Sequence, residues 1–265
     1  MLIPRSPLIL SGFLAIGLVL SGCVGPRAPA AGDESFNDPL EDTNRGIFAF
    51  NQEVDRNVLV PVANAYRNVV PPPMQQSLHD FLQNLDEPII FANDVLQGQA
   101  GLAAQSFGRL AVNTTIGIGG MFDVATRIGI PFHSNDLGVT LATYGFDSGP
   151  YLVIPVLGPS NVRDLVGQVG DSFGDPGDYF AGQYHRIYAA VGRSIAQGVD
   201  TRARNIESLA DIERTALDNY ATIRSLYRQR REAQIRHEKS DLPNPAPVQG
   251  GDNGAESAIS YTIAK

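Results

Sequence analysis

The sequence predicts an all-α, mostly helical fold, and three observations lead to this prediction. The sequence DPLE at residues 38–41 is a helix-start signal, apolar side chains recur at helical spacing between residues 47 and 96, and residues 200–237 carry a long amphipathic stripe. Apolar residues three and four apart share one face of a helix, so this spacing is typical of helices packed on a common core. The length suits one compact domain at residues 38–238.

The first helix is expected to start at residues 38–41. Asp38 can cap it, Pro39 is tolerated at the first helical position, and Glu41 can complete a capping box. Apolar residues then continue at helical spacing as far as Val58.

Prolines divide the next region. The three prolines at residues 71–73 should break the chain, after which helical spacing resumes at Leu78. Asp86 and Glu87 are interpreted as the acidic start of a further turn at Pro88, and Gly98 as a C-terminal cap.

The last predicted element, residues 200–237, is one or two amphipathic helices. Its arginines have two interpretations: a solvated face favoured by the helix dipole, or attraction to acidic lipids or an acidic partner. The arginines concerned are Arg224, Arg228, Arg230, Arg231 and Arg236.

Two stretches in the middle are unusually poor in charge. Residues 95–122 contain one charged side chain, Arg109, and residues 148–162 contain none. The prolines of the second stretch argue against a helix and against a central strand. One interpretation is a buried hairpin with an irregular core segment; the other is backbone at membrane depth. Glycines 117, 119 and 120 are a candidate hinge in the first stretch.

The N-terminus has the pattern of an export signal followed by a lipidation site. A positive start and a short apolar run precede Leu-Ser-Gly-Cys at residues 20–23, so residues 1–22 are predicted to be a cleaved signal peptide. Cys23 is the only cysteine, which leaves it without a disulfide partner and available for acylation. Residues 23–37 are predicted to be a flexible lipidated linker and residues 239–265 a disordered tail.

Composition argues against several function classes. The formal net charge of −8 disfavours nucleic-acid binding, which requires cations against phosphates. There is no P-loop pattern, the four histidines lack metal-ligand spacing, and no cofactor or metal is predicted.

One sequence pattern is compatible with an esterase. The sequence GDSFG at residues 170–174 matches a serine nucleophile pattern, which requires a strand before Ser172 and a helix after it. Residues 165–169 are a candidate strand, but residues 174–177 look like a turn. A lipid-anchored serine esterase that uses Ser172, with His185 or His237 as base, is therefore the weaker alternative.

Several motifs together resemble the MlaA (VacJ) family of outer-membrane lipoproteins, across about residues 38–231. They are DPLE at 38–41, NLDEP at 84–88, the run FGRLAVNTTIGIGGMFDVA at 107–125, and GPYLVIPVLGPS at 149–160 followed by Arg163-Asp164. Small departures stand at Ala142, Tyr144 and Asn219.

This resemblance implies a ring-like, non-enzymatic domain of amphipathic helices with a hairpin, embedded in the inner leaflet of the outer membrane and facing the periplasm. Through an amphipathic pore, such a protein removes mislocalised phospholipids from the outer leaflet and passes them to a periplasmic lipid carrier, which maintains lipid asymmetry. Trimeric porins are implied partners, and a purely structural porin-associated lipoprotein is a further alternative. The candidate membrane-facing hairpin comprises Phe107, Leu110, Ile116, Ile118, Met121 and Phe122.

Overall fold

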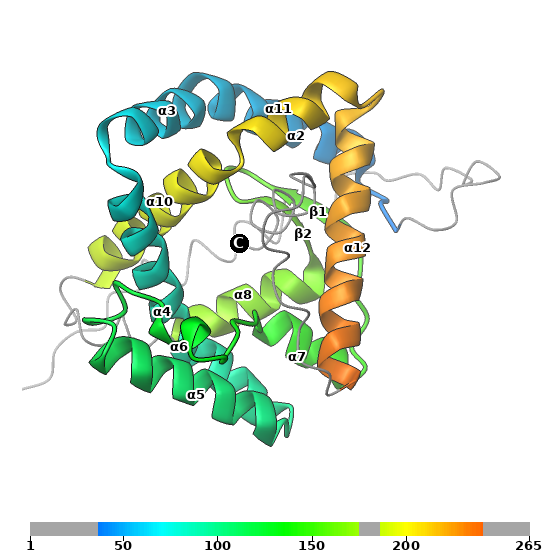
Figure 1. Cartoon of the computed structure of the whole chain (residues 1–265). Helices are drawn as coiled ribbons and strands as arrows, with labels where there is room; N and C mark the ends of the chain where they lie inside the picture. Colours follow the sequence, from blue (N-terminus) through cyan, green and yellow to red (C-terminus); the bar gives the residue numbers. More distant parts are fainter. Residues whose placement is uncertain (1–36, 175–185, 241–265) are drawn as a thin grey trace, which may run out of the picture. The chain divides into compact units, whose positions relative to one another are not determined.

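The computed structural model describes residues 37–174 and 186–240. The signal peptide, Cys23, His185 and residues 241–265 therefore lie outside the described residues. The described elements, labelled in Figure 1, are α2 (Glu41–Val54), a π-helical turn (Asp55–Leu59), α3 (Val60–Val69), α4 (Pro72–Leu96), α5 (Ala100–Thr115), α6 (Val124–Arg127), α7 (Leu137–Thr143), β1 (Tyr151–Ile154), β2 (Gly158–Asn161), α8 (Val162–Gly174), α10 (Arg186–Arg204), α11 (Ile206–Thr215) and α12 (Asn219–Ser240).

The contacts among these elements form a closed circuit. α2 packs on β1, β2 on α12, α12 on α7, and α7 on α4. α4 also contacts α10, which packs on α3, and α3 continues back into α2 through the π-helical turn. The last helix thereby meets the first ones, as Figure 1 shows for α12 and α2 at the upper right. The all-α prediction is confirmed, with one short hairpin as the described strand structure.

The start of the first helix differs from the expectation. α2 begins at Glu41 after Leu40, and no side chain caps it. The carboxylate of Asp38 instead accepts hydrogen bonds from Asn44 Nδ2 at 2.8 Å and from Arg224 Nη1 at 2.7 Å. The Asp38 carboxylate therefore joins α2 to α12 and does not cap α2, so the predicted capping box is wrong.

Helix α4 runs through Pro88 rather than starting there. The chain breaks at Pro71 as predicted, but α4 already begins at Pro72, before the expected resumption at Leu78, and Gly98 with φ +73° follows its end. Pro88 removes the helical hydrogen bond that the carbonyl of Asn84 would accept, a cost that tertiary packing outweighs. The interpretation of Asp86 and Glu87 as a helix start is therefore wrong.

The second charge-poor stretch forms a two-stranded antiparallel hairpin. Tyr151 pairs with Asn161 and Ile154 with Gly158, around a turn in which Val156 has φ +68°. Both strands are edges, which explains how β2 accommodates Pro159. Buried Tyr151 and Val153 pack with Tyr220 and Tyr227 of α12, whereas Val156 and Leu157 in the turn are exposed. The buried-hairpin interpretation therefore holds for the inner face of the strands and not for the turn.

The C-terminal region contains three helices, α10, α11 and α12, in place of one or two. In the described part of the chain no helix is both long and apolar enough to span a membrane.

Candidate functional site

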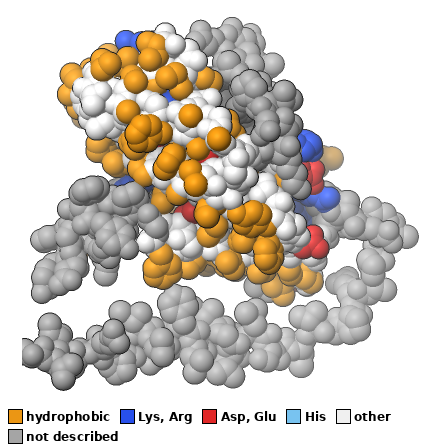
Figure 2. All heavy atoms as spheres, turned by 90° about the horizontal axis from the view of Figure 1, so that it is seen from below, with side chains coloured by type: hydrophobic (Ala, Val, Ile, Leu, Met, Phe, Trp, Pro, Cys, Tyr) orange, Lys and Arg blue, Asp and Glu red, His pale blue; other side chains and the backbone are white. Residues whose placement is uncertain are grey.

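The charge-poor stretch at residues 95–122 forms the end of α4, helix α5 and the loop after it, and it presents an apolar surface. Phe107 on α5 is 58% exposed, and Ile116 and Ile118 in the loop are 66% and 65% exposed. Met121 and Phe122 are exposed beside them, whereas Leu110 is half-buried. Figure 2, seen from the side of α5, shows hydrophobic side chains spread over this face, with charged side chains gathered at its right edge.

Arg109, the single charged residue of this stretch, points inward and is 1% exposed. Its Nε donates to Glu87 Oε1 of α4 at 2.5 Å, and its Nη2 donates to Asp123 Oδ2 at 3.2 Å. Its Nη1 donates to Thr126 Oγ1 and to the carbonyl of Ile130. One guanidinium therefore joins α4, α5, the N-terminal cap of α6 and the segment after α6. Burying a charge requires such complete pairing.

Of the two carboxylates that pair with Arg109, Glu87 is the one whose ionised form is less favoured. It is 1% exposed, and burial raises its pKa to about 7 even though the adjacent Arg109 lowers it. Asp123 behaves differently: burial raises its pKa, but hydrogen bonds from Thr126 and the charge of Arg109 bring it below the usual value.

Packing requires two of the three glycines after α5, and backbone conformation favours glycine at the third. A Cβ at Gly117 would lie 2.3 Å from the carbonyl oxygen of Phe122, and one at Gly120 would lie 2.5 Å from Cβ of Asn84. Gly119 and Gly120 have φ +69° and +92°, conformations that favour glycine. The tight turn thus sits against α4, and the hinge remains a prediction.

A second buried carboxylate lies further along α4. Asp94 accepts from Ser106 Oγ at 2.6 Å, from Asn135 Nδ2 at 2.8 Å and from His133 Nε2 at 3.1 Å. The serine hydroxyl donates directly to the carboxylate, which differs from a Ser–His–Asp relay, where it donates to the imidazole. These three donors fix α5 and the segment before α7 to α4.

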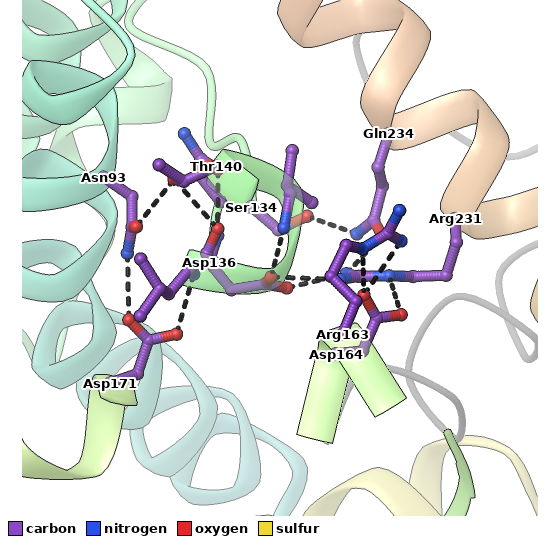
Figure 3. A network of polar contacts seen from close by, with 12 residues as sticks. Asn93, Ser134, Asp136, Thr140, Arg163, Asp164, Asp171, Arg231 and Gln234 are labelled. Atoms are coloured by element: carbon purple, nitrogen blue, oxygen red, sulfur yellow. Dashed lines mark hydrogen bonds and ion pairs between the residues drawn. The ribbon is translucent and has the colours of Figure 1, made fainter. Parts of the chain in front are cut away.

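Figure 3 shows a third network, which holds α12 to α7 and α8. Arg231 of α12 is buried and donates from Nε to Asp164 Oδ2 at 2.8 Å and from Nη1 to Asp136 Oδ2 at 2.7 Å. Asp171 of α8 accepts from the backbone N–H of Leu137 and from Asn93 Nδ2 of α4. Burial raises the pKa of Asp171 to about 6.

This network corrects both interpretations of the arginine cluster. Arg224 and Arg231 are buried in ion pairs with acidic residues of other elements, and Arg230 is half-buried. Arg228 and Arg236 fit the solvated face, near Glu232. Sequence reasoning missed the partners Asp38, Asp136 and Asp164 because their separation along the chain gives no local signal.

Helices α8 and α10 each carry an exposed apolar stripe. On α8 it comprises Val162, Val166, Val169 and Phe173, and on α10 it comprises Tyr188, Val191 and Ile195. On the other side of α10, Arg193 donates to Asp86 Oδ1 of α4 at 2.5 Å. α10 therefore has an exposed apolar side and a side that pairs with α4, which makes it amphipathic.

Ser172 does not sit on a nucleophile elbow. Residues 165–169, predicted as a strand, belong to helix α8, and the exposed Ser172 donates its hydroxyl back to the carbonyl of Val169 at 2.7 Å. The nucleophile pattern requires a strand before the serine, so the predicted strand is wrong and the esterase geometry is missing at this position. In the described ranges, no cluster of three or more His, Cys, Asp or Glu residues is arranged to hold a metal ion.

Comparison with known proteins decides the family. A family model described as MlaA lipoprotein matches residues 36–234. The chain belongs to the MlaA lipoprotein family. The resemblance drawn from the motifs at residues 84–88 and 107–125 is thereby confirmed.

Relatives and a solved structure agree with this assignment. The chain is 34% identical to the intermembrane phospholipid transport system lipoprotein MlaA of Haemophilus influenzae, covering 87% of this chain and 91% of the relative. The protein of the same name from Escherichia coli K12 is 33% identical, with 83% and 86% covered. A chain from a structure described as "Structural basis for maintenance of bacterial outer membrane lipid asymmetry" matches with a TM-score of 0.67 at 32% identity, covering 75% of this chain and 98% of that one.

Proposed function

We propose that this chain is an outer-membrane lipoprotein, anchored through Cys23, that removes mislocalised phospholipids from the outer leaflet and so maintains lipid asymmetry. The observation that carries the proposal is the apolar face of α5 and the loop after it, in a family whose named relatives are phospholipid-transport lipoproteins. A surface this poor in charge over a fully paired arginine is suited to lying in the acyl region of one leaflet.

The proposed path for lipid is an amphipathic pore. Its support is the pair of exposed apolar stripes on α8 and α10, which suit acyl chains. A conduit needs no nucleophile, and the position of Ser172 on a helix agrees with that. We place trimeric porins beside the domain in the membrane and a periplasmic lipid carrier as the acceptor.

The function is tested by deleting the gene and complementing it. The deletion strain is expected to accumulate outer-leaflet phospholipid and to become sensitive to detergent, and the wild-type gene and a Ser172→Ala allele are expected to restore both. Normal asymmetry in the deletion strain contradicts the proposal. Mass spectrometry of the purified native complex separates transport from a purely structural role, because only a transporter is expected to carry bound phospholipid.

The membrane-facing surface has its own test. Phe107→Glu places a charge on the exposed face, which is expected to weaken binding of the purified domain to phospholipid vesicles about tenfold or more. The free energy of unfolding is expected to fall by about 0.5–1.5 kcal/mol, because the ring contact with Phe91 is lost. Leu217→Glu is the matched control, since Leu217 is fully exposed in the turn between α11 and α12. Equal loss of vesicle binding in both variants contradicts this placement.

A further inference from the structure

The buried cluster under the apolar loop has more hydrogen-bond acceptors than donors. Oε2 of Glu87 and Oδ1 of Asn84 are both buried and have no hydrogen-bond partner within the described residues. Pro88, inside α4, has no N–H to offer to the backbone carbonyl of Asn84. Glu87 and Asn84 are three residues apart on α4, so their side chains are neighbours on one helix face.

The charges around Glu87 act in both directions, and burial decides the outcome. Arg109 from α5, which contacts Glu87, and His133 from the segment before α7 lower the pKa of Glu87, whereas Asp123 from the α6 cap raises it. Asp80 and Asp94 are further buried carboxylates of α4. Burial outweighs the opposing charges, and an unpaired buried acceptor costs free energy that an added proton removes.

We propose that Glu87 is a proton-operated latch for the loop at residues 116–122. When Glu87 takes up a proton, its new O–H donates to Oδ1 of Asn84, while Oε1 continues to accept from Nε of Arg109. Asn84 is the side chain on which Gly120 packs, and its Nδ2 donates to Thr114 Oγ1 at 3.1 Å. Protonation thereby fixes the side chain that holds both the end of α5 and the glycine turn.

The direction of the pH effect follows from burial. Burial raises the pKa of Glu87 from 4.5 to about 7, so the folded cluster favours the protonated form. The stabilisation is complete below the unfolded pKa and is lost as pH rises through about 7. The loop is therefore held more tightly in acid and released in alkali.

Hydrogen exchange of the full-length lipidated chain in detergent, between pH 5.5 and 8, tests the latch. The amides of Gly117, Gly119, Gly120 and Phe122 are hydrogen-bonded to the carbonyls of residues 112, 114, 113 and 117 and report on loop opening. After correction for intrinsic exchange rates, their protection in wild type is expected to fall roughly tenfold or more across this range. Peptides from α12 (Asn219–Ser240), which makes no hydrogen bond to these loop amides, serve as an internal reference.

Glu87→Gln is the decisive variant, because its amide supplies a permanent donor for Asn84 and retains the acceptor for Arg109. Protection in Glu87→Gln is expected to be independent of pH and close to the wild-type value in acid. A wild-type loop insensitive to pH, or a Glu87→Gln loop with the wild-type dependence, overturns the latch.

A second pair of variants decides the matter if Glu87→Gln fails to fold. Asn84→Ala removes the acceptor and is expected to lower the pH at which protection is lost, whereas Thr114→Val removes only the bond from Asn84 and is expected to leave that pH unchanged. Equal midpoints in the two variants overturn the proposal. The latch rests on the proposed function, which places this loop against lipid. Because hydrogen exchange is measured without lipid transport, the experiment can contradict the latch without contradicting the transport function.

Discussion

Helices α5 and α12 manage charge in opposite ways. α5 has one charged residue, Arg109, and hides it beneath an apolar outer face. α12 is rich in arginine, exposes Arg228 and Arg236, and buries Arg224 and Arg231 in ion pairs with α7, α8 and the residues before α2.

The distribution of charged side chains indicates the surroundings of the outer side of each helix. Both helices join distant elements through buried guanidinium groups, so the inner sides are alike. Only α12 keeps charges on its outer side, where Arg228 and Glu232 form an exposed pair. An outer face without charges suits lipid, and a charged one suits water.

The largest expected effect is at Arg109. Arg109→Ala leaves buried Glu87 and half-buried Asp123 without their cation, and we expect it to lower the free energy of unfolding by about 3–5 kcal/mol. Arg127→Ala, at an exposed position on α6, is the control and is expected to change it by less than about 0.5 kcal/mol. Chemical denaturation followed by circular dichroism measures both. Similar losses of stability in the two variants would contradict the claim that buried Arg109 holds α5 to its neighbours.

Arg231 tests the second half. Arg231→Ala removes the cation that pairs with Asp136 and Asp164. The pKa values of both carboxyl groups are lowered in the wild type, because the charge and hydrogen bonds of Arg231 outweigh the effect of burial. We expect a loss of about 2–4 kcal/mol and earlier proteolysis within α12. Arg228→Ala, on the same helix, breaks an exposed pair with Glu232 and is expected to cost about 0.5 kcal/mol or less. A larger effect at Arg228 would show that the outer face of α12 is a structural contact.

Gly119 and Gly120 test how tightly the turn after α5 packs against α4. Gly120→Ala forces a Cβ against Asn84 in a conformation with φ +92°, and we expect a loss of about 2 kcal/mol. Gly119→Ala is strained only by φ +69°, since nothing lies within 4 Å of its Cβ, and we expect about 1 kcal/mol. Thermal unfolding of the two variants measures the difference. A greater loss at Gly119 would mean that the turn moves away from α4 in solution, as the hinge prediction requires.

Local patterns predicted much of the fold. The break at residues 71–73, the cap at Gly98 and the charge-poor surface after Val95 depend on neighbours in sequence, and the structure contains all three. Pro88 was misread because a local rule cannot weigh the cost of a proline against the packing of a helix of 25 residues.

The family, the all-α fold and the charge-poor stretch at residues 95–122 could all be predicted from the sequence. Motifs, helical period and composition are local properties, which the chain carries before it folds. Only the tertiary structure decided which charges are buried and with which partners. Arg224 meets Asp38 across 186 residues, and Arg109 meets Glu87 across 22. Such pairs form only where the fold excludes water and brings both groups together, and neither condition is recorded in the sequence near either residue.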